Sequence, residues 1–275
     1  RSSNPRKPQV FLNASYYLPT TRAGSHDLKA GLEWLDDSAT SGETGTSGAI
    51  LYLDRNGAPS QIRLTDVGDP GSFGDTWRPS EDGNARVAAY LQDRWSVSRR
   101  LTVTAGLRVD RQRPYYGASR RDPLLAGVFP AVDTPGRTLF VRQTVAPRVG
   151  ASFDLSDRGR SIAKVFWGRY HHNLARSFAG VNPGGTNTRT YAFLDQNGNG
   201  LYDGIDELGT LVASTGGATT SYDPDLVIPR TDEISVSFEQ QLRGDSAARV
   251  AWVRKSTRHQ IGTYNAAWVD QLTVP

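Results

Sequence analysis

The chain has 275 residues, of which 37% are hydrophobic, and it contains no cysteine and no methionine. Without cysteine there is no disulfide, thiol nucleophile or cysteine-based metal site, and without methionine the natural chain is expected to begin before Arg1. The net charge is +4 and the 32 basic residues are scattered, which indicates no nucleic-acid partner, and no apolar run reaches the roughly 18 residues of a membrane-spanning helix.

The first predicted strands lie near the N-terminus. Leu28, Ala30, Leu32 and Trp34 are apolar at every second position, while the residues between them are charged or small. Because alternate side chains of a strand point to opposite faces, this pattern predicts a strand with one apolar face. Segment 10–18 is expected to be its antiparallel partner.

The clearest pair of strands follows at residues 86–110. Two rows of alternating apolar residues flank the short polar stretch 98–100: Val87, Ala89, Leu91, Trp95 and Val97 in the first row, and Leu101, Val103, Ala105, Leu107 and Val109 in the second. Only Asp93 interrupts the first row. A short polar link between two alternating rows predicts a tight antiparallel hairpin.

The same unit recurs twice. Alternating apolar residues at 145–155 lead into a turn at 156–160 and a return strand. Near the end of the chain, a row at 234–242 leads into a turn at 243–246 and a return strand that begins at Val250. No segment has helical periodicity. We count roughly ten strands of about nine to twelve residues, the length that a tilted strand needs to cross a bilayer.

The connections between the predicted strands alternate in length. The turns after Val97, Leu155 and Leu242 are short, whereas segments 111–141 and 170–229 are long and rich in Gly, Pro, Asn and Thr. Outer-membrane barrels have short periplasmic turns and long extracellular loops, which distinguishes them from soluble sandwiches with more uniform spacing.

We therefore predict an all-β fold in which residues 1–275 form part of an antiparallel transmembrane β-barrel, located in the outer membrane of a Gram-negative bacterium. Residues 171–229 are expected to be a long extracellular excursion. Local spacing supports neither a Ser-His-Asp set nor a pair of catalytic carboxylates, so no enzymatic activity is expected.

Several stretches of sequence follow one another in an order typical of one protein family. Residues 24–31 read Gly-Ser-His-Asp-Leu-Lys-Ala-Gly, and the hairpin at 84–110 contains Tyr-Leu-Gln-Asp-Arg-Trp and then Leu-Thr-Val-Thr-Ala-Gly-Leu-Arg-Val-Asp. Residues 146–150 read Ala-Pro-Arg-Val-Gly, and residues 231–235 read Thr-Asp-Glu-Ile-Ser. Together they resemble the barrel of TonB-dependent receptors, in particular the Oar-like branch.

The resemblance implies a barrel of about 22 strands whose lumen holds an N-terminal plug. The sequence has neither a plug nor a TonB box, and at about 25 residues per strand a whole barrel needs on the order of 550 residues. The chain is therefore expected to be a partial barrel. The partners implied are outer-membrane lipid, the TonB complex through a plug outside this chain, an unknown extracellular ligand, and surface proteins.

Residues 195–207 follow the pattern of an acidic calcium loop, in which Gly200 permits the sharp turn. The predicted ligands of a structural Ca²⁺ ion are Asp195, Asn197, Asn199, Leu201 through its backbone carbonyl, Asp203 and Asp206. Asp206 stands where such loops usually have a bidentate glutamate, and Glu207 is its neighbour. The alternative interpretation is that the Asn-Gly-Asn-Gly stretch only makes turns.

The leading functional hypothesis is a receptor or transporter barrel that takes up or binds an extracellular ligand. One alternative is an outer-membrane anchor or adhesion protein that does not transport. Another is a secreted, soluble β-sandwich binding module stabilised by calcium. The last is disfavoured because a soluble sandwich hides its apolar strand faces and seldom needs such unequal loops.

Overall fold

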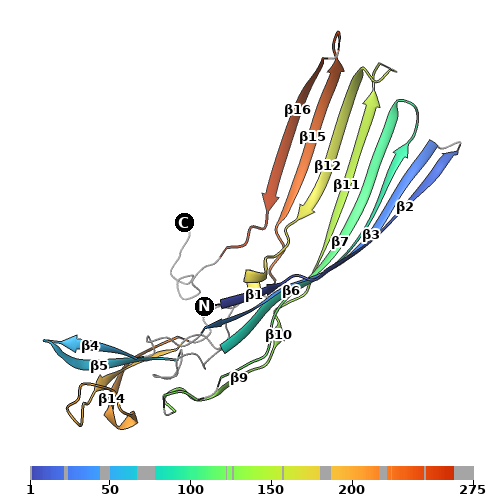
Figure 1. The fold of residues 1–275 in the computed structure, drawn as a ribbon. Helices are drawn as coiled ribbons and strands as arrows, with labels where there is room; N and C mark the ends of the chain where they lie inside the picture. The colour runs from blue at the N-terminus through green and yellow to red at the C-terminus, as the bar shows by residue number, and fades with distance from the viewer. Residues whose placement is uncertain are drawn as a thin grey trace.

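The computed structural model describes residues 2–21, 24–43, 50–66, 78–121, 123–125, 127–156, 158–179, 187–216, 222–223, 225–244 and 246–262. One antiparallel sheet has the strand order β1-β3-β6-β7-β11-β12-β15-β16, with β2 paired to β3 and β10 paired to β7. Its strands are β1 (Ser2–Arg6), β2 (Gln9–Thr21), β3 (Gly24–Glu43), β6 (Arg78–Ser96), β7 (Leu101–Tyr116), β10 (Arg137–Thr138), β11 (Arg142–Asp154), β12 (Ser161–His171), β15 (Arg230–Gln241) and β16 (Ala247–Arg258). We call this sheet the wall (Figure 1).

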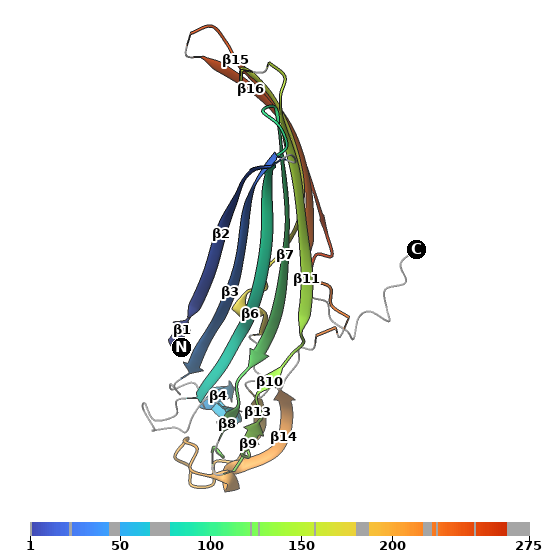
Figure 2. The same ribbon diagram turned by 90° about the vertical axis from the view of Figure 1, so that its right-hand side faces the viewer.

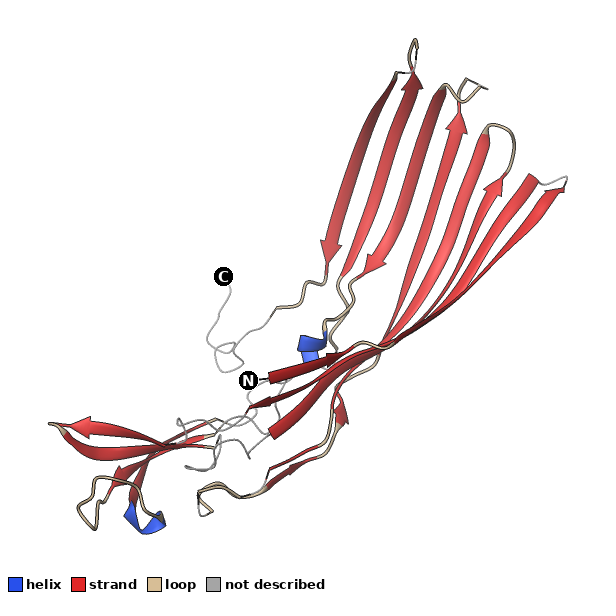
Figure 3. Cartoon of the chain, viewed as in Figure 1, coloured by secondary structure: helices blue, strands red, loops and turns tan. Residues whose placement is uncertain are grey.

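Four long hairpins, β2–β3, β6–β7, β11–β12 and β15–β16, build the wall. The pairings that the sequence predicts are confirmed, since Val10 lies opposite Trp34 and Leu91 lies opposite Leu107. The wall has ten strands, in agreement with the roughly ten predicted, but β1 and β10 are short and the other eight have 11 to 20 residues. Among the described residues, helix is confined to short 3₁₀ turns (Figure 3), and none is long and apolar enough to cross a membrane.

Local polar contacts close the hairpin turns. The Ser98 hydroxyl accepts hydrogen bonds from the backbone N–H groups of Arg100 at 3.2 Å and Leu101 at 3.1 Å. In the β11–β12 turn, Asp154 accepts the N–H of Gly159 at 2.6 Å, and Gly159 has a φ of 71°, which glycine adopts without strain. Such bonds hold a short turn in one conformation and thereby fix the register of the strands.

The two faces of the wall differ in polarity. One face is apolar and exposed, with Leu91 58% and Leu107 47% accessible. On the opposite face, charged and polar side chains are buried, with Asp110 7% and Gln112 1% accessible. We call them the apolar face and the polar face. An exposed apolar surface of this extent suits contact with lipid, and the polar face of such a sheet then lines the barrel lumen.

Three apolar rows end in a tryptophan on the side of the long connections. Trp34 in β3, Trp167 in β12 and Trp252 in β16 are each the last apolar residue of their row before charged residues follow. Trp is favoured at the boundary between hydrocarbon and water. Strands β3, with 20 residues, and β6, with 19 residues, therefore extend past the apolar part of the wall.

Strands β11 and β12 separate part of the way along the wall. They pair from Arg148 opposite Gly168 to Asp154 opposite Ile162, whereas β11 stays paired with β7 up to Arg142. Pro147, the next residue, has no N–H to offer to β12, so the ladder between the two strands ends there.

The long connections form a second sheet with the order β14-β13-β5-β4 and a short ribbon of β8 and β9. Their bounds are β4 (Ile50–Arg55), β5 (Ala58–Thr65), β8 (Ser119–Arg121), β9 (Val132–Thr134), β13 (Thr188–Phe193) and β14 (Leu208–Thr215), with the 3₁₀ turns η1 (Arg176–Ala179) and η2 (Ile205–Glu207). They share one core: Ile62, Leu64, Leu124, Leu125, Val128, Phe129 and Phe193. This module lies at the end of the wall opposite the hairpin turns (Figure 2).

Candidate functional site

A network of buried charges lies on the polar face of the wall. Arg108 of β7 donates from Nη2 to Glu33 of β3 at 2.7 Å and from Nε to Asp110 at 2.9 Å. Arg86 of β6 makes a second ion pair with Glu33. The side chains of Glu33, Arg86 and Asp110 are only 10 to 11% accessible. The two cations and two anions thus neutralise one another. This pairing offsets the free energy that each charge loses when it is removed from water.

The register of three strands explains how the network forms. Glu33, Ala88 and Asp110 lie side by side across β3, β6 and β7, and Arg108 is two residues along the strand from Asp110. Ala88 is 2% accessible and has the smallest side chain of the row. Because Ala88 is short, the side chain of Arg108 reaches Glu33 across β6.

The segment that follows β12, residues 172–179, crosses the polar face beside this network. The amide of Gln112 donates to the carbonyl of His172 at 3.2 Å and accepts the N–H of Leu174 at 2.9 Å. Asn84 donates to the Leu174 carbonyl at 2.8 Å, and Arg176 forms an ion pair with Asp82 at 2.7 Å. We call this segment the strap. It narrows the space beside the polar face and is held by buried polar groups.

The strap leads into an aromatic cluster beyond the wall. The Phe178 ring lies 5.0 Å from the Tyr222 ring and 5.9 Å from the Phe140 ring, measured between centroids. The Tyr222 hydroxyl donates to the Phe178 carbonyl. Burial raises the pKa of Tyr222 above its usual value. These contacts join the connections that follow β7 and β12.

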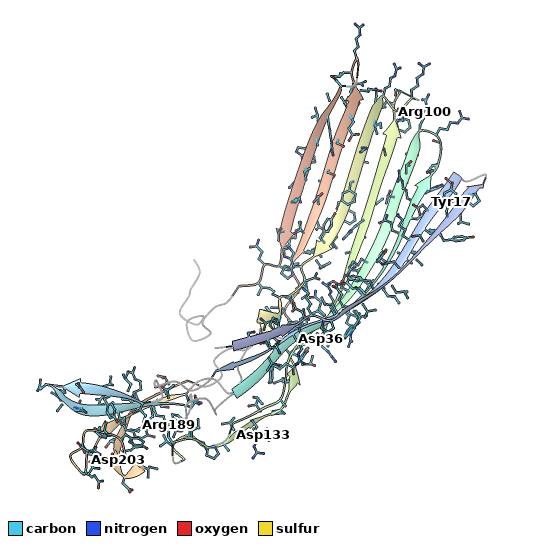
Figure 4. The ribbon with its side chains drawn as sticks, in the orientation of Figure 1. Tyr17, Asp36, Arg100, Asp133, Arg189 and Asp203 are labelled. Carbon is cyan, nitrogen blue, oxygen red and sulfur yellow. The ribbon has the colours of Figure 1, made fainter. Side chains whose placement is uncertain are left out.

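The loop module is held together by contacts between connections that are distant in sequence. Asp66, after β5, accepts hydrogen bonds from the N–H of Asn187 at 2.9 Å and from its side-chain amide at 2.7 Å. The Arg189 guanidinium lies over the Phe129 ring, 5.4 Å from its centroid. Arg189 and Asp203 both lie in this module, far from Arg100 at a hairpin turn (Figure 4). The described parts of the long connections therefore form one folded unit.

The structure brings the predicted calcium ligands into one small loop between β13 and β14. The Asp195 carboxylate accepts the N–H groups of Gly198, Asn199 and Gly200 at 2.8 to 3.1 Å. Asn197 and Asn199 donate to the Asp203 carboxylate at 2.6 and 2.7 Å, and the N–H of Leu201 donates to Asn199 at 2.7 Å.

The last predicted ligand has a different position. The side chain of Asp206 is exposed, and its backbone carbonyl accepts the Gln196 amide at 2.7 Å. Its neighbour Glu207 is buried and accepts the N–H of Asp203 at 2.8 Å. Within the described part of the chain, no three His, Cys, Asp or Glu side chains form a group suited to a metal ion. A metal ion in this loop would therefore need oxygen ligands from Asn197 and Asn199 as well as from carboxylates.

Asp93, which interrupts the apolar row of β6, has a partner that the sequence does not reveal. His26 Nδ1 lies 2.7 Å from the Asp93 carboxylate, and the His26 ring stacks on Trp95 with centroids 5.5 Å apart. The pair joins residues 67 positions apart, so only the register of β3 and β6 brings it together.

Sequence analysis alone did not select the charged network as a site. Arg108 and Asp110 alternate with the apolar residues of their predicted strand, but no role was predicted for them. The available signal was a run of charged residues on alternate positions of predicted membrane strands, where ionisable groups are costly and usually functional. Which charges meet depends on the register of non-adjacent strands.

Comparisons with known proteins agree with this architecture. Residues 17–274 match a family model described as an outer membrane β-barrel domain. No curated protein matches the sequence. Among solved structures, the chain is similar to the ferric-catecholate import receptor Fiu from E. coli K12 in its closed form, with a TM-score of 0.51 and 13% identity.

That match covers 96% of this chain but 32% of the receptor, so the chain spans about a third of that protein's length. At this identity the likeness concerns the fold alone. The family match covers most of the chain, and the exposed apolar face and the polar, buried opposite face of the wall are those of a membrane barrel. The chain therefore belongs to the outer membrane β-barrel domain family and is located in the outer membrane of Gram-negative bacteria.

Proposed function

We propose that the chain is the partial barrel of a TonB-dependent receptor that takes up or binds an extracellular ligand. The observation that carries this proposal is the charged network of Glu33, Arg86, Arg108 and Asp110 on the polar face, with the strap folded beside it. Ionisable groups within membrane-spanning strands are often functional, and this network faces the lumen, where a ligand or a plug would lie.

A TonB-dependent receptor fills its lumen with a plug domain. The polar face offers groups to such a plug or to a passing ligand: the Asn84 Oδ1 and Arg86 Nε atoms are buried and have no hydrogen-bond partner among the described residues. Buried polar atoms are usually satisfied. A plug that enters from outside this chain would supply the missing partners.

The experiment uses the full-length protein in its native outer membrane. Formaldehyde cross-linking in cells, followed by immunoblotting, tests for an adduct with TonB, and cells that lack TonB are the control. A specific adduct is the expected result. If the full-length protein forms no adduct while a known receptor in the same cells does, the anchor or adhesion hypothesis replaces transport.

Uptake is measured separately with a ferric catecholate as the first probe, because Fiu is an importer of ferric catecholates. Accumulation of iron that depends on both the protein and TonB supports transport of this ligand class. An adduct with TonB but no accumulation of iron assigns the receptor to another ligand.

We also propose that residues 195–207 bind a structural calcium ion. Asp195, Asn197, Asn199 and Asp203 converge on one loop, and hard oxygen donors are what calcium requires. Asn197 and Asn199 would turn their carbonyl oxygens toward the ion, while Asp195 would keep the loop closed through its N–H bonds. The expected role is to hold the loop in one conformation.

A further inference from the structure

The backbone ladder between β11 and β12 is interrupted on the side of the long connections. It stops short of Pro147, although β11 continues to Arg142 along β7 and β12 continues to His171 along β15. His171 Nε2 contacts the Val145 carbonyl at 3.2 Å, and Arg142 Nε donates to the Leu226 carbonyl at 2.7 Å. Side chains therefore bridge this part of the wall in place of a backbone ladder.

A cleft of about 380 Å³ lies at the interruption, within the size range of small-molecule sites. It is lined by residues 142–144, His171 and residues 225–228. Thr144 lies directly opposite Asp110 of β7, which places it on the polar face. The cleft therefore adjoins the charged network, on the side of the wall that lines the lumen.

The strap accounts for the burial of Thr144, which is 6% accessible. The strap leaves β12 and crosses β11 to reach β7, where Gln112 donates to the His172 carbonyl at 3.2 Å. The hydroxyl oxygen of Thr144 is buried and has no hydrogen-bond partner in the described part of the chain. Because a buried hydroxyl without a partner costs free energy, a molecule that supplies the partner gains binding free energy.

Two further groups of the cleft accept hydrogen bonds. His171 alternates onto the outer face of β12 and reaches the cleft through the interrupted ladder. Its Nε2 faces a carbonyl and carries the ring proton, so the buried Nδ1, which has no partner among the described residues, is an acceptor. The carboxylate of Asp225 lines the cleft and makes no hydrogen bond or ion pair with the residues described. The cleft thus selects a molecule rich in O–H donors.

The charges around the cleft favour a neutral molecule. Arg142 lines the cleft and Arg230 lies across from the end of β12, so a cation would be repelled. Asp225 would repel an anion, and the Arg142 guanidinium is already engaged by a backbone carbonyl and by the Phe140 ring, 5.2 Å from its centroid. Residues 226–228 give the cleft an apolar side.

We propose that the cleft binds a neutral sugar unit of an oligosaccharide that enters from outside the cell. A sugar combines hydroxyl groups, which both donate and accept hydrogen bonds, with an apolar C–H face. Its hydroxyl groups bond to Thr144, His171 Nδ1 and Asp225, and its C–H face packs on residues 226–228. Uptake of this sugar rests on the proposed transport function, whereas its binding does not.

The test uses the full-length protein purified in detergent and an array of neutral and acidic oligosaccharides. Neutral glycans are expected to bind, and calorimetric titration of a bound glycan then gives its Kd. Thr144→Val removes the buried hydroxyl and should raise the Kd at least about tenfold, as expected for the loss of one good hydrogen bond. Thr104→Val, on the polar face of β7 outside the cleft, is the matched control and should stay within about twofold.

Asp225 provides a test of the charge of the bound molecule. Asp225→Asn keeps an acceptor oxygen and should weaken binding less than Asp225→Ala. Tighter binding by the Asp225→Asn variant, or binding of acidic glycans alone, would show that the site takes an anion and would overturn the proposal. The proposal also fails if no neutral glycan binds, or if Thr144→Val and Thr104→Val have equal effects. Thermal unfolding of each variant shows whether the fold is kept.

The source of the sugar is tested with oligosaccharide released from the lipopolysaccharide of the native cells. If this oligosaccharide alone binds, the cleft holds a membrane lipid and not a molecule from outside. Binding of a neutral glycan without a TonB adduct would keep this inference and remove uptake. An adduct with TonB but no glycan binding would keep the receptor and remove the sugar site.

Discussion

The ring of Tyr90 in β6 lies directly over Gly31 in β3, where it fills the place that a side chain on residue 31 would occupy. The Tyr90 hydroxyl reaches past Gly31 to the side chain of Asn13 in β2, where it donates a hydrogen bond at 3.0 Å. One aromatic side chain thus joins three strands of the wall across a glycine. Such aromatic cover of a glycine helps to fix strand register.

Substitution of Gly31 by alanine is expected to destabilise the barrel, because the new methyl group would overlap the Tyr90 ring and the Asn13 side chain. We expect a loss of about 1 to 3 kcal/mol in the free energy of unfolding. Gly106→Ala is the control, since a Cβ there is 3.4 Å from its nearest neighbour. The measurement is urea unfolding of the full-length protein in detergent. Equal stability of the two variants would contradict the role of the Tyr90–Gly31 contact.

Glu33→Gln is expected to weaken the polar-face network, because Arg86 and Arg108 both lose their shared anion. The loss should be about 2 kcal/mol, lower than for a fully buried pair because Arg108 is partly accessible. Glu239→Gln is the control, as its partner Lys164 is 42% accessible and water screens the pair. Unfolding by urea gives both values, and an equal effect at the two sites would show that burial of the network is unimportant.

Leu107→Lys places a charge on the apolar face, within the predicted bilayer. A cation near the middle of a barrel strand costs about 2 to 4 kcal/mol when it faces lipid. Thr104→Lys, three residues away on the polar face, is the matched control and should be tolerated. Folding yield into lipid vesicles measures the difference. The opposite order of tolerance would mean that the polar face, not the apolar face, meets the lipid.

Calcium is expected to raise the melting temperature of the full-length protein, and chelation should reverse the change, because a bound ion stabilises the conformation that holds it. Asp195→Asn should abolish this response, since Asp195 accepts three N–H bonds of the loop. Asp54→Asn, in the β4 strand, is the control for lost charge. A calcium response that survives in the Asp195 variant would place any ion elsewhere.

The aromatic cluster around Tyr222 should lose stability at alkaline pH. Burial raises the pKa of Tyr222 in the folded protein, so the stabilisation is complete below the unfolded value of about 10 and is lost as pH rises through the folded value. Thermal unfolding between pH 8 and pH 12, scanned in steps of about one unit, tests this. Tyr222→Phe should reduce the slope of the melting temperature against pH. An unchanged slope would show that other groups cause the loss of stability.

The hairpins of the wall could be predicted because their information is local. Rows such as Leu101 to Val109, together with the polar stretch at 98–100, determine strand direction, turn position and which side chains share a face. The same alternation identified the apolar face, and the family match and the exposure of Leu107 agree with it.

The sites were only partly predictable. The acidic loop at 195–207 is continuous in sequence, so its members could be named in advance, although the burial of Glu207 and the exposure of Asp206 could not. Glu33 and Arg108 are 75 residues apart, and their contact requires both the β3–β6–β7 order and a small residue at Ala88.

The sequence by itself determined the alternation of apolar and polar residues, the short turns and the membrane-facing side, because each depends on neighbours within about ten residues along the chain. Only the tertiary structure decided that the strap crosses the polar face and that distant connections share the core around Ile62 and Phe193. It also decided that β11 and β12 separate above Pro147. These features arise from contacts between segments far apart in the chain, and such contacts exist only once the strand order and register are fixed.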